Sequence, residues 1–582
     1  MKWWKLLKPK PKKIINMQKI FSFLNKYKYW FFCVAIFFAI GLRVWDFSGG
    51  MLLKGDQIRD AVMSARSFEN GFGELPLLGP RAGGTMLRLG PLFYYFQSAS
   101  AAIFGSIEPA VLALPNLLFS LLAIPLFFFL MRLYFSEKVS LISTTLFSFC
   151  FLAFEYSRFA WNPNSIPFFV LLFLYAWLRI FSDSERKKWQ WFLLLGTAFA
   201  IASQLHFTSM VALGIFAAVF LIFRYKNFWQ KVGWINLVVF LATVLFFYIP
   251  VIVSDVLSKG DNLDLFFKSI GSKTSDHTAW QNIGREFYYF GEYYFRIAFG
   301  YMGSLKILHY LGTLLLFGGT VLNVLLLRQE KEKQKKDFLF VILVWTATFF
   351  LLYFPLAYEI DKPRFFLPLM FLPFLHLGLL WRWKSSFEKT KKISVVILAL
   401  LMLAGNLTAS LLWLNEFARA QRGALNAKNT VILKVKKDDA WWTWGMIEKT
   451  AKIMSKECQG GAIYYYLPKQ SQEFQDVFEW AFKLNGKQRP YSFAKKIDFE
   501  KKGCYFAISK QTYEMDKLMI LGDFEKTGNA GDIAIYKMKR EKTEEAVVVE
   551  KKNEPILEDE DDISIQTHQR LYWKDVFKKT NN

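Results

Sequence analysis

The sequence predicts a polytopic α-helical membrane protein of about eleven transmembrane helices, with a small α+β domain near its C-terminal end. Three observations predict this fold class. Hydrophobic residues make up 53% of the 582 residues, and aromatic residues make up 18%. Apolar runs of about 17–25 residues, the length that crosses a hydrocarbon core, recur as far as Leu414 and then stop. Basic residues gather in short loops between these runs, as the positive-inside rule expects.

The N-terminal segment 1–28 carries nine Lys and no acidic residue. Such a segment suits the anionic inner leaflet, so we expect it to be cytoplasmic. No small-residue cleavage site follows the first apolar run, which favours a retained anchor over a cleaved signal peptide. The net charge of +25 is therefore attributed to membrane topology, and no nucleic-acid partner is expected.

Length and apolarity predict the positions of the spans. The segment 91–105 is apolar but has only 15 residues, so we interpret it as an interfacial or re-entrant helix. With that assignment the basic loops, such as 328–336 and 382–392, all fall on the cytoplasmic side. The expected spans are 29–46, 109–131, 139–156, 165–181, 189–205, 209–223, 232–254, 304–327, 338–355, 365–381 and 393–414.

This topology divides the chain after the N-terminus into three parts. Residues 29–414 form the transmembrane domain, whose first outer loop spans 47–108. Residues 415–540 contain the strand-like runs IYYYLP, CYFAIS and DIAIYKM and the amphipathic run QEFQDVFEWAFKL, which predict an extracytoplasmic α+β domain. Residues 541–582 are rich in charge and poor in aromatics, and we expect a flexible tail.

Four Cys are too few for a disulfide framework. Cys33 and Cys150 lie in apolar runs and are interpreted as inert thiols. Cys458 and Cys504 both fall in the C-terminal domain, and they are candidates for a disulfide if that domain is outside the cell.

The notable polar motifs all fall in the predicted outer loops, and this common location is the main indication of a functional site. The first loop contains GDQIRDA, the second EYSRFAWNPNS, the third QLHFTS, and a later one LAYEIDKPR. The candidate site residues are Asp56, Arg59, Asp60, Arg88, Arg158, Asn162, Asn164, His206, Lys362 and Arg364.

These residues also have structural interpretations, which the sequence leaves open. The Asn-Pro-Asn segment 162–164 is a good turn between two spans. His206 at a helix end can bond a free carbonyl. Lys362 and Arg364 can be interfacial anchors whose charged ends reach water. Asp56 is a favourable cap for the helical run QIRDAVMSARSF that follows it, and a cap and a catalytic role are compatible.

Soluble-enzyme motifs do not compete with this interpretation. The sequence has no GxxxxGK[ST] phosphate loop and no His/Cys cluster with zinc spacing. No cofactor is required by the sequence. A divalent metal is compatible with it, but no metal ligands can be assigned.

The order of these motifs resembles that of the GT-C-type membrane glycosyltransferases. Within them it is similar to the dolichyl-phosphate-mannose protein mannosyltransferase and aminoarabinose transferase group. GDQIRDA resembles the family's Asp-Glu motif, with Asp56 on its Asp. GPLFYYF resembles its Pro-Pro-Leu-Tyr-Tyr-Trp segment, and EYSRFAWNPN its second outer loop. PRFFLPLMFLP resembles a late Arg-Tyr-Leu-Leu-Pro stretch, which places Arg364 on the family's Arg. The resemblance covers roughly residues 29–414.

The sequence departs from the family pattern at two positions. Gln57 stands where the family has Glu, which puts a two-carboxylate metal site in doubt. Leu89 stands where the family has Lys, with Arg88 beside it, so phosphate binding at this position depends on the neighbouring residue.

The resemblance implies an inverting membrane glycosyltransferase. It would move a sugar from a polyprenyl-phosphate carrier to an acceptor hydroxyl of a glycan, lipid or protein on the outer face of the cell membrane. Asp56 would be the general base, and Arg59, Arg364, Arg88 and Lys362 would hold the phosphate. The polyprenyl tail gains about 0.8 kcal/mol per buried CH₂, which keeps the donor in the membrane lipid.

The competing class is a polytopic transporter or lipid flippase of cell-envelope glycans. Such proteins place ionisable groups inside their spans and often contain repeated halves. The sequence has few charges within the predicted spans and no obvious repeat. A third class is a non-catalytic scaffold whose outer domain binds a cell-wall polymer.

Overall fold

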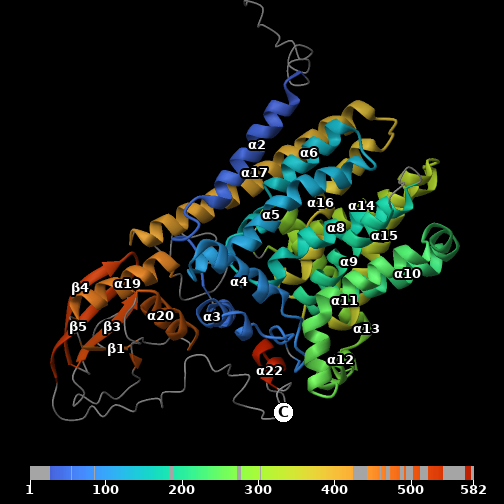
Figure 1. Cartoon of the computed structure of the whole chain (residues 1–582). Helices are drawn as coiled ribbons and strands as arrows, with labels where there is room; N and C mark the ends of the chain where they lie inside the picture. The colour runs from blue at the N-terminus through green and yellow to red at the C-terminus, as the bar shows by residue number, and fades with distance from the viewer. Residues whose placement is uncertain are drawn as a thin grey trace, which may run out of the picture.

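The computed structural model is mostly helical, with a five-stranded sheet at one end of the molecule (Figure 1). It describes residues 26–53, 55–83, 85–182, 188–271, 277–301, 303, 305–423, 442–458, 461–466, 472–485, 491–492, 503–510, 522–541 and 570–578. The helices of the bundle and its loops are α2 (Lys28–Val44), α3 (Gly55–Asn70), α4 (Leu92–Phe104), α5 (Pro109–Arg132), α6 (Glu137–Ser148), α7 (Phe151–Tyr156), α8 (Ile166–Phe181), α9 (Lys188–Leu205), α10 (Phe207–Lys231), α11 (Trp234–Leu257), α12 (Asp261–Gly271), α13 (Ala279–Phe299), α14 (Lys306–Gln329), α15 (Lys333–Tyr353), α16 (Leu372–Arg382) and α17 (Glu388–Gln421).

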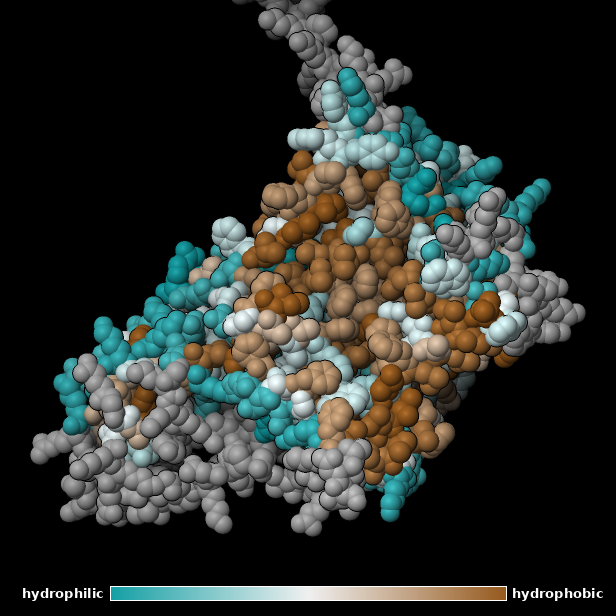
Figure 2. Space-filling view, viewed as in Figure 1, coloured by the Kyte–Doolittle hydropathy of each residue, from teal (hydrophilic) through white to brown (hydrophobic). Residues whose placement is uncertain are grey.

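Within the described residues, seven helical stretches are long and apolar enough to cross a membrane. Hydrophobic side chains cover much of the visible face of the bundle (Figure 2). Helices also occupy the other four predicted spans, but their crossing of the membrane stays a prediction. The seven stretches are Pro109–Arg132, Asn162–Phe181, Trp234–Leu257, Lys306–Gln329, Lys333–Leu356, Pro363–Arg382 and Glu388–Gln421.

Several predicted boundaries differ from the observed ones. The predicted span 139–156 is two helices, α6 and α7, with a break at Phe149–Cys150. The apolar segment 91–105 is the 13-residue helix α4, which is shorter than the roughly 20 residues that a span needs. Helix α17 continues to Gln421 instead of ending at Leu414, because its last turns bury Phe417 and Ala420 against neighbouring elements.

Asn406, in the middle of α17, holds the break between α6 and α7. Its amide oxygen accepts from the N–H of Phe151 at 2.7 Å, the first residue of α7. Its amide nitrogen donates to the carbonyls of Ile297, Ala298 and Met402. The side chain is fully buried, so it satisfies helix-end groups that water cannot reach.

Two glycines allow α13 to end against α17. Gly300 ends α13 in the left-handed conformation, with a φ of 64°. A Cβ added to Gly405 would lie 2.2 Å from the carbonyl oxygen of Phe299. Only glycine permits this close approach of the two backbones.

The C-terminal domain combines helices with a small sheet, in agreement with the predicted α+β class. It comprises α19 (Trp444–Glu457), β1 (Ala462–Tyr466), α20 (Gln472–Leu484), β2 (Tyr491–Ser492), β3 (Gly503–Lys510), β4 (Gly522–Ala530) and β5 (Ile533–Glu541). The strand order is β2-β1-β3-β5-β4, in which β1 runs parallel to β2 and β3, and β5 runs antiparallel to β3 and β4. Gly531 and Asp532 connect β4 and β5 in a tight turn, and Gly531 supplies its positive φ.

A disulfide between Cys458 and Cys504 joins the end of α19 to β3. The domain is also attached to the first outer loop through backbone hydrogen bonds. The N–H of Trp444 donates to Met51 at 2.7 Å, and the N–H of Gly445 donates to Gly49 at 3.1 Å. The sheet domain therefore packs beside the loop that carries Asp56.

The predicted flexible tail 541–582 contains an ordered segment. Residues 570–578, which include the short helix α22 (Trp573–Lys578), lie against the first outer loop near α3 (Figure 1). This part of the prediction is corrected because Leu571, Tyr572 and Trp573 pack and hydrogen-bond with the loop. The rest of the predicted tail lies outside the described residues, as does most of the predicted cytoplasmic segment 1–28.

We expect Asn406→Leu to lower the thermal unfolding temperature, because each buried polar group left unsatisfied costs about 1–3 kcal/mol. The matched control is Asn323→Leu in α14. Asn323 is equally buried, but its side chain makes a single hydrogen bond, to Leu339 at 3.2 Å, among the described residues. Differential scanning fluorimetry in detergent should show the larger loss for Asn406→Leu, and equal losses would contradict the assigned role.

Candidate functional site

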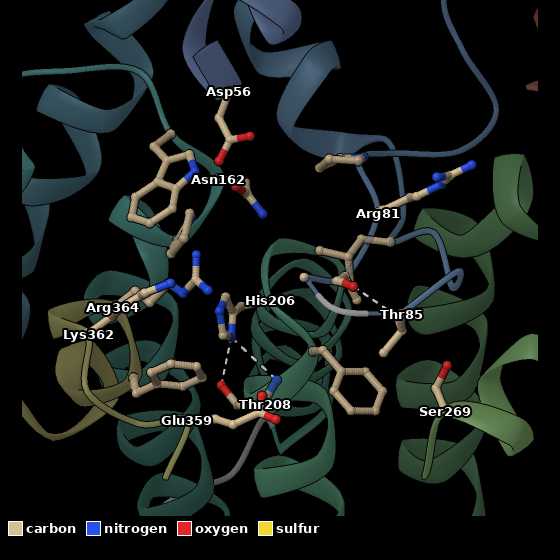
Figure 3. A pocket seen from close by; sticks show the side chains of 18 of the residues that line it. Asp56, Arg81, Thr85, Asn162, His206, Thr208, Ser269, Glu359, Lys362 and Arg364 are labelled. Atoms are coloured by element: carbon tan, nitrogen blue, oxygen red, sulfur yellow. Dashed lines mark hydrogen bonds between the residues drawn. The ribbon is translucent and has the colours of Figure 1, made fainter. Parts of the chain in front are cut away.

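A cavity of about 950 Å³ lies where six segments of the chain meet. Its walls come from α3, the loop 80–89, the turn before α8, the α9–α10 junction, α12 and the segment 359–365. Figure 3 shows the labelled side chains around this space. The segments are separated by up to about three hundred residues in sequence, so the cavity exists only in the folded protein.

Helix α3 presents Asp56 to the cavity and fixes it with an arginine. The Arg59 guanidinium donates to Asp56 at 3.1 Å and to Asp60 at 2.9 Å. Residues three and four apart share one face of a helix, which brings the three side chains together. The Asp56 side chain is 54% exposed, whereas that of Asp60 is fully buried and also accepts from the Tyr94 hydroxyl at 3.1 Å. Burial lowers the pKa of Arg59, but the interactions with Asp60, Tyr94 and Asp56 together outweigh it and hold that pKa well above its ordinary value.

The loop 80–89 forms one wall as a hairpin-like turn. The N–H of Gly79 donates to Leu89 at 2.7 Å, and the N–H of Leu89 donates to Pro80 at 2.9 Å. A Cβ on Gly79 would lie 2.2 Å from the carbonyl oxygen of Gly90, so the two chain segments can only meet with glycine there. The turn carries lining residues that include a further cation, Arg81.

The turn before α8 and the start of α10 form the opposite wall. Asn162 donates its amide to the carbonyl of Leu205 at 2.6 Å, which ties the NPN turn to the end of α9. The His206 ring nitrogen Nδ1 lies 2.6 Å from the Thr208 hydroxyl (Figure 3). This ring also packs edge-on against Phe365. Asn162 and His206 therefore line the cavity and join the elements around it.

Arg364 enters the cavity from the loop before α16. Its guanidinium lies over the rings of Trp161 and Phe365, with centroids at 5.6 and 5.3 Å, and points into the space beneath Asp56 (Figure 3). Lys362 lines the same side. Among the described residues, neither Arg364 nor Lys362 has a hydrogen-bond or ion-pair partner for its side chain. Both cations therefore retain their donors for a ligand.

The lining residues carry more positive than negative charge. Five cations stand against three carboxylates, an excess of two. The arrangement can hold an anion such as a phosphate between guanidinium groups while one exposed carboxylate remains close to it. The cations are Arg59, Arg81, Lys268, Lys362 and Arg364, and the carboxylates are Asp56, Glu359 and Asp361.

The structure brings six of the ten predicted site residues to this cavity and places a seventh directly behind it. The six are Asp56, Arg59, Asn162, His206, Lys362 and Arg364, and Asp60 is the seventh. Arg88, Arg158 and Asn164 do not line it.

The buried positions of these three residues give them structural contacts. Arg158 donates to the carbonyls of Arg43 at 2.7 Å and Asp46 at 2.8 Å, which ties the end of α2 to α7. The Arg88 backbone exchanges two hydrogen bonds with the Asn262 side chain, which anchors the hairpin-like loop to α12. Asn164 donates to the carbonyl of Phe159 at 2.9 Å inside its own turn. Asn164 therefore has a structural role in the NPN turn, whereas Asn162 lines the cavity and stays a candidate site residue.

Sequence reasoning did not select several lining residues. Arg81 and Lys268 are single cations in loops or amphipathic helices, where a solvated charge is the usual explanation. Trp161 and Thr208 lie in the motifs EYSRFAWNPNS and QLHFTS, but a neutral ring and a hydroxyl were not selected beside Asn162 and His206. Glu359 and Asp361 lie in the LAYEIDKPR motif beside the selected Lys362 and Arg364, but they were not selected as site residues themselves.

The donor set around Asp56 fits a divalent metal poorly. Asp56 is paired with Arg59, and the next residue, Gln57, is a buried amide. Across the described part of the chain, no group of three or more His, Cys, Asp or Glu residues could hold a metal ion. A carboxylate already paired with a guanidinium is a weak start for a cage of hard oxygen ligands.

Two of three comparisons relate the chain to known proteins. Residues 89–253 match the model of the dolichyl-phosphate-mannose-protein mannosyltransferase family. The crystal structure of ArnT from Cupriavidus metallidurans in the apo state aligns with a TM-score of 0.50 and 12% identity, over 88% of this chain and 98% of that one. The search of curated proteins found no match.

Two further solved structures align at lower scores. ArnT from Cupriavidus metallidurans bound to undecaprenyl phosphate aligns at a TM-score of 0.49 and 12% identity, over 87% of this chain and 97% of that one. The Archaeoglobus fulgidus oligosaccharyltransferase in the apo form aligns at 0.48 and 12% identity, over 84% of this chain and 70% of that one.

The matched family model covers the end of the first outer loop, α4, the NPN turn and His206, which are elements around the cavity. The likeness to apo ArnT extends over most of the chain and concerns the fold. The resemblance stated from the sequence is therefore confirmed: residues 89–253 match the model of the dolichyl-phosphate-mannose-protein mannosyltransferase family, and the chain shares its fold with ArnT.

Proposed function

We propose that the protein is an inverting glycosyltransferase that moves a sugar from a polyprenyl-phosphate carrier to an acceptor hydroxyl on the outer face of the cell membrane. One observation carries the proposal. An exposed carboxylate, Asp56, and two cations without described partners, Lys362 and Arg364, line one cavity although three hundred residues separate them. The family match to a group named for dolichyl-phosphate-mannose supports the donor class.

The proposed reaction forms a bond between the acceptor oxygen and the anomeric carbon. The bond between that carbon and the phosphate oxygen breaks, and the acceptor proton passes to Asp56. The leaving carrier phosphate gains one negative charge, so Arg364 and Lys362 interact more strongly with it in the transition state than in the donor. Arg59 keeps Asp56 oriented, and its ion pair with Asp60 keeps Arg59 in place.

The outer location is supported by two independent features. The basic loops fall on the side opposite to the cavity loops in the predicted topology. The Cys458–Cys504 disulfide suits an oxidising compartment, and its domain is attached to the loop that carries Asp56. Uptake or lipid flipping by the purified protein, without any sugar transfer, would favour the transporter class instead.

We expect Asp56→Asn to lower transfer by about 10²–10⁴-fold, because a general base typically contributes this factor. Transfer of radiolabelled sugar from polyprenyl-phosphate mannose, and from a panel of other carrier-linked sugars, measures the loss. Glu69→Gln is the matched control, since Glu69 lies in the last turn of the same helix and pairs with Lys483 outside the cavity. A folded Asp56→Asn protein with full activity would remove Asp56 from the mechanism.

Arg364→Ala should lower kcat by about 10²–10³-fold and raise the KM for the donor, since it removes a preorganised donor to the phosphate. Arg364→Lys should recover little, because an ammonium cannot present the fork of N–H donors with which a guanidinium binds a phosphate. Steady-state kinetics with varied donor concentration measures both constants. A change confined to the KM for the acceptor would contradict the assignment of Arg364 to the donor phosphate.

We further propose that no divalent metal takes part, given the poor donor set around Asp56. Dialysis of the purified protein against EDTA should leave transfer within about twofold of the untreated rate, since a lost Lewis acid would remove several kcal/mol of transition-state stabilisation. Restoration of a lost rate by added Mn²⁺ or Mg²⁺ would overturn this prediction.

A further inference from the structure

The last described segment of the chain extends the first outer loop. The N–H of Leu77 donates to the carbonyl of Leu571 at 2.8 Å, and the N–H of Trp573 donates to Leu75 at 3.1 Å. Pro76 and Tyr572 form an antiparallel bridge between these bonds. Residues 570–573 therefore add a short strand to the loop segment 75–77.

Side chains strengthen this docking on both sides of the added strand. The Trp573 indole N–H donates to the Tyr95 hydroxyl at 2.8 Å, and its ring stacks on Phe72 with centroids 6.0 Å apart. Lys574 pairs with Glu74 at 2.7 Å. Aromatic and charged contacts of this kind, combined with backbone pairing, distinguish a specific docking from a chain end that only covers a surface.

The docked segment places a cation, Arg570, close to α3, the helix that carries Asp56. Arg570 is 2% exposed, donates to the carbonyl of Gly79 at 3.4 Å and lies over the ring of Tyr94 at 5.7 Å. Gly79 begins the loop that lines the cavity. The Tyr94 hydroxyl donates to Asp60, which pairs with Arg59. Contacts therefore run from Arg570 through Tyr94, Asp60 and Arg59 to Asp56.

We infer that residues 570–578 form a clasp that completes the active site, and that Arg570 is a positioning residue for Asp56. The clasp fixes the two parts of the first outer loop that carry the site, namely the hairpin-like loop after Gly79 and the Tyr94–Tyr95 pair at the start of α4. The inference rests on the proposed function for the role of Asp56, whereas the docking itself does not.

Arg570 has a specific physical task in this arrangement. Its position over Tyr94 holds that ring by a cation–π contact and orients the hydroxyl toward Asp60. Tyr94 is itself fully buried, so a rotation of its ring would leave Asp60 short of a donor. A shift of Asp60 then moves Arg59, and with it the carboxylate that receives the proton.

A cysteine crosslink tests the docking without reference to activity. A Cβ built on Gly73 would lie 3.4 Å from the Cβ of Lys574, close to the Cβ separation of about 3.5–4.5 Å in disulfides. We expect Gly73→Cys with Lys574→Cys to crosslink in the full chain, in membranes and in a Cys33→Ser background. Gly73→Cys with Val576→Cys is the control, since residues two apart on a helix face different ways.

Mass spectrometry of the linked peptides reads the crosslink. Efficient crosslinking of the first pair alone supports the clasp. Its absence, or equal crosslinking of the control pair, overturns the docked position whatever the enzymatic activity is.

Substitutions of Arg570 test the positioning role. We expect Arg570→Gln to lower kcat by about 10–100-fold with little change in the KM for the donor. A small displacement of Asp56 from its reactive position reduces the rate of the chemical step, whereas the cations that bind the donor stay in place. Arg570→Lys should recover part of the loss, since an ammonium also interacts with an aromatic face. Arg422→Gln, an exposed arginine at the end of α17, is the matched control.

The two hypotheses fail in different ways. Full kcat in Arg570→Gln overturns the positioning role while the Asp56 mechanism stands. If folded Arg570→Gln loses activity, the Gly73→Cys and Lys574→Cys crosslink can be added to the same variant. Full recovery of the rate by this crosslink would assign the effect to loop docking and overturn the specific role of Arg570. Full activity of Asp56→Asn would end the proposed function and leave the crosslink result unaffected.

Discussion

The arginine between two carboxylates is the interaction on which the site depends. Asp60 has no exposed side-chain surface, and an unpaired carboxylate in that position would cost several kcal/mol. Arg59 supplies the compensating charge, and its second set of donors reaches Asp56, which is half exposed. The buried pair therefore fixes an arginine that in turn orients an accessible carboxylate. Asp56 can meet a substrate because the adjacent charges are already satisfied inside the protein.

The rest of the molecule supports this pair by close packing at a few points. Gly79 and Gly90 let two strands of the first outer loop approach each other, and Tyr94 extends from the next helix to Asp60. Asn406 holds the broken helix on the far side of the bundle. The contacts of Gly79, Gly90 and Tyr94 set the positions of the first outer loop and α3, which reach the cavity, whereas Asn406 stabilises the bundle that carries them.

Much of this could be predicted from the sequence, because membrane topology sorts residues by side. Asp56, Arg59, Lys362 and Arg364 were expected to share a surface since their loops alternate with apolar spans. Amphipathic and strand periodicity likewise predicted α20 and the strands β1, β3 and β5. The segment around Arg570 could not be found in this way, because its contacts with residues 72–95 span almost the whole chain and leave no local period.

Arg158 and Arg364 show why residue type alone misjudges a site. Both lie within motifs of the predicted outer loops, and the guanidinium of each lies over a tryptophan ring. The distance to the ring centroid is 5.0 Å for Arg158 and Trp413 and 5.6 Å for Arg364 and Trp161. Arg158 lies at the C-terminal end of α2, where unsatisfied carbonyls and the negative end of the helix dipole take up its donors. Arg364 meets rings alone among the described residues, and rings leave guanidinium N–H groups free to bind an anion. The difference between a structural and a ligand-binding arginine is thus the number of carbonyls within reach, a quantity that depends on tertiary packing and not on sequence motif.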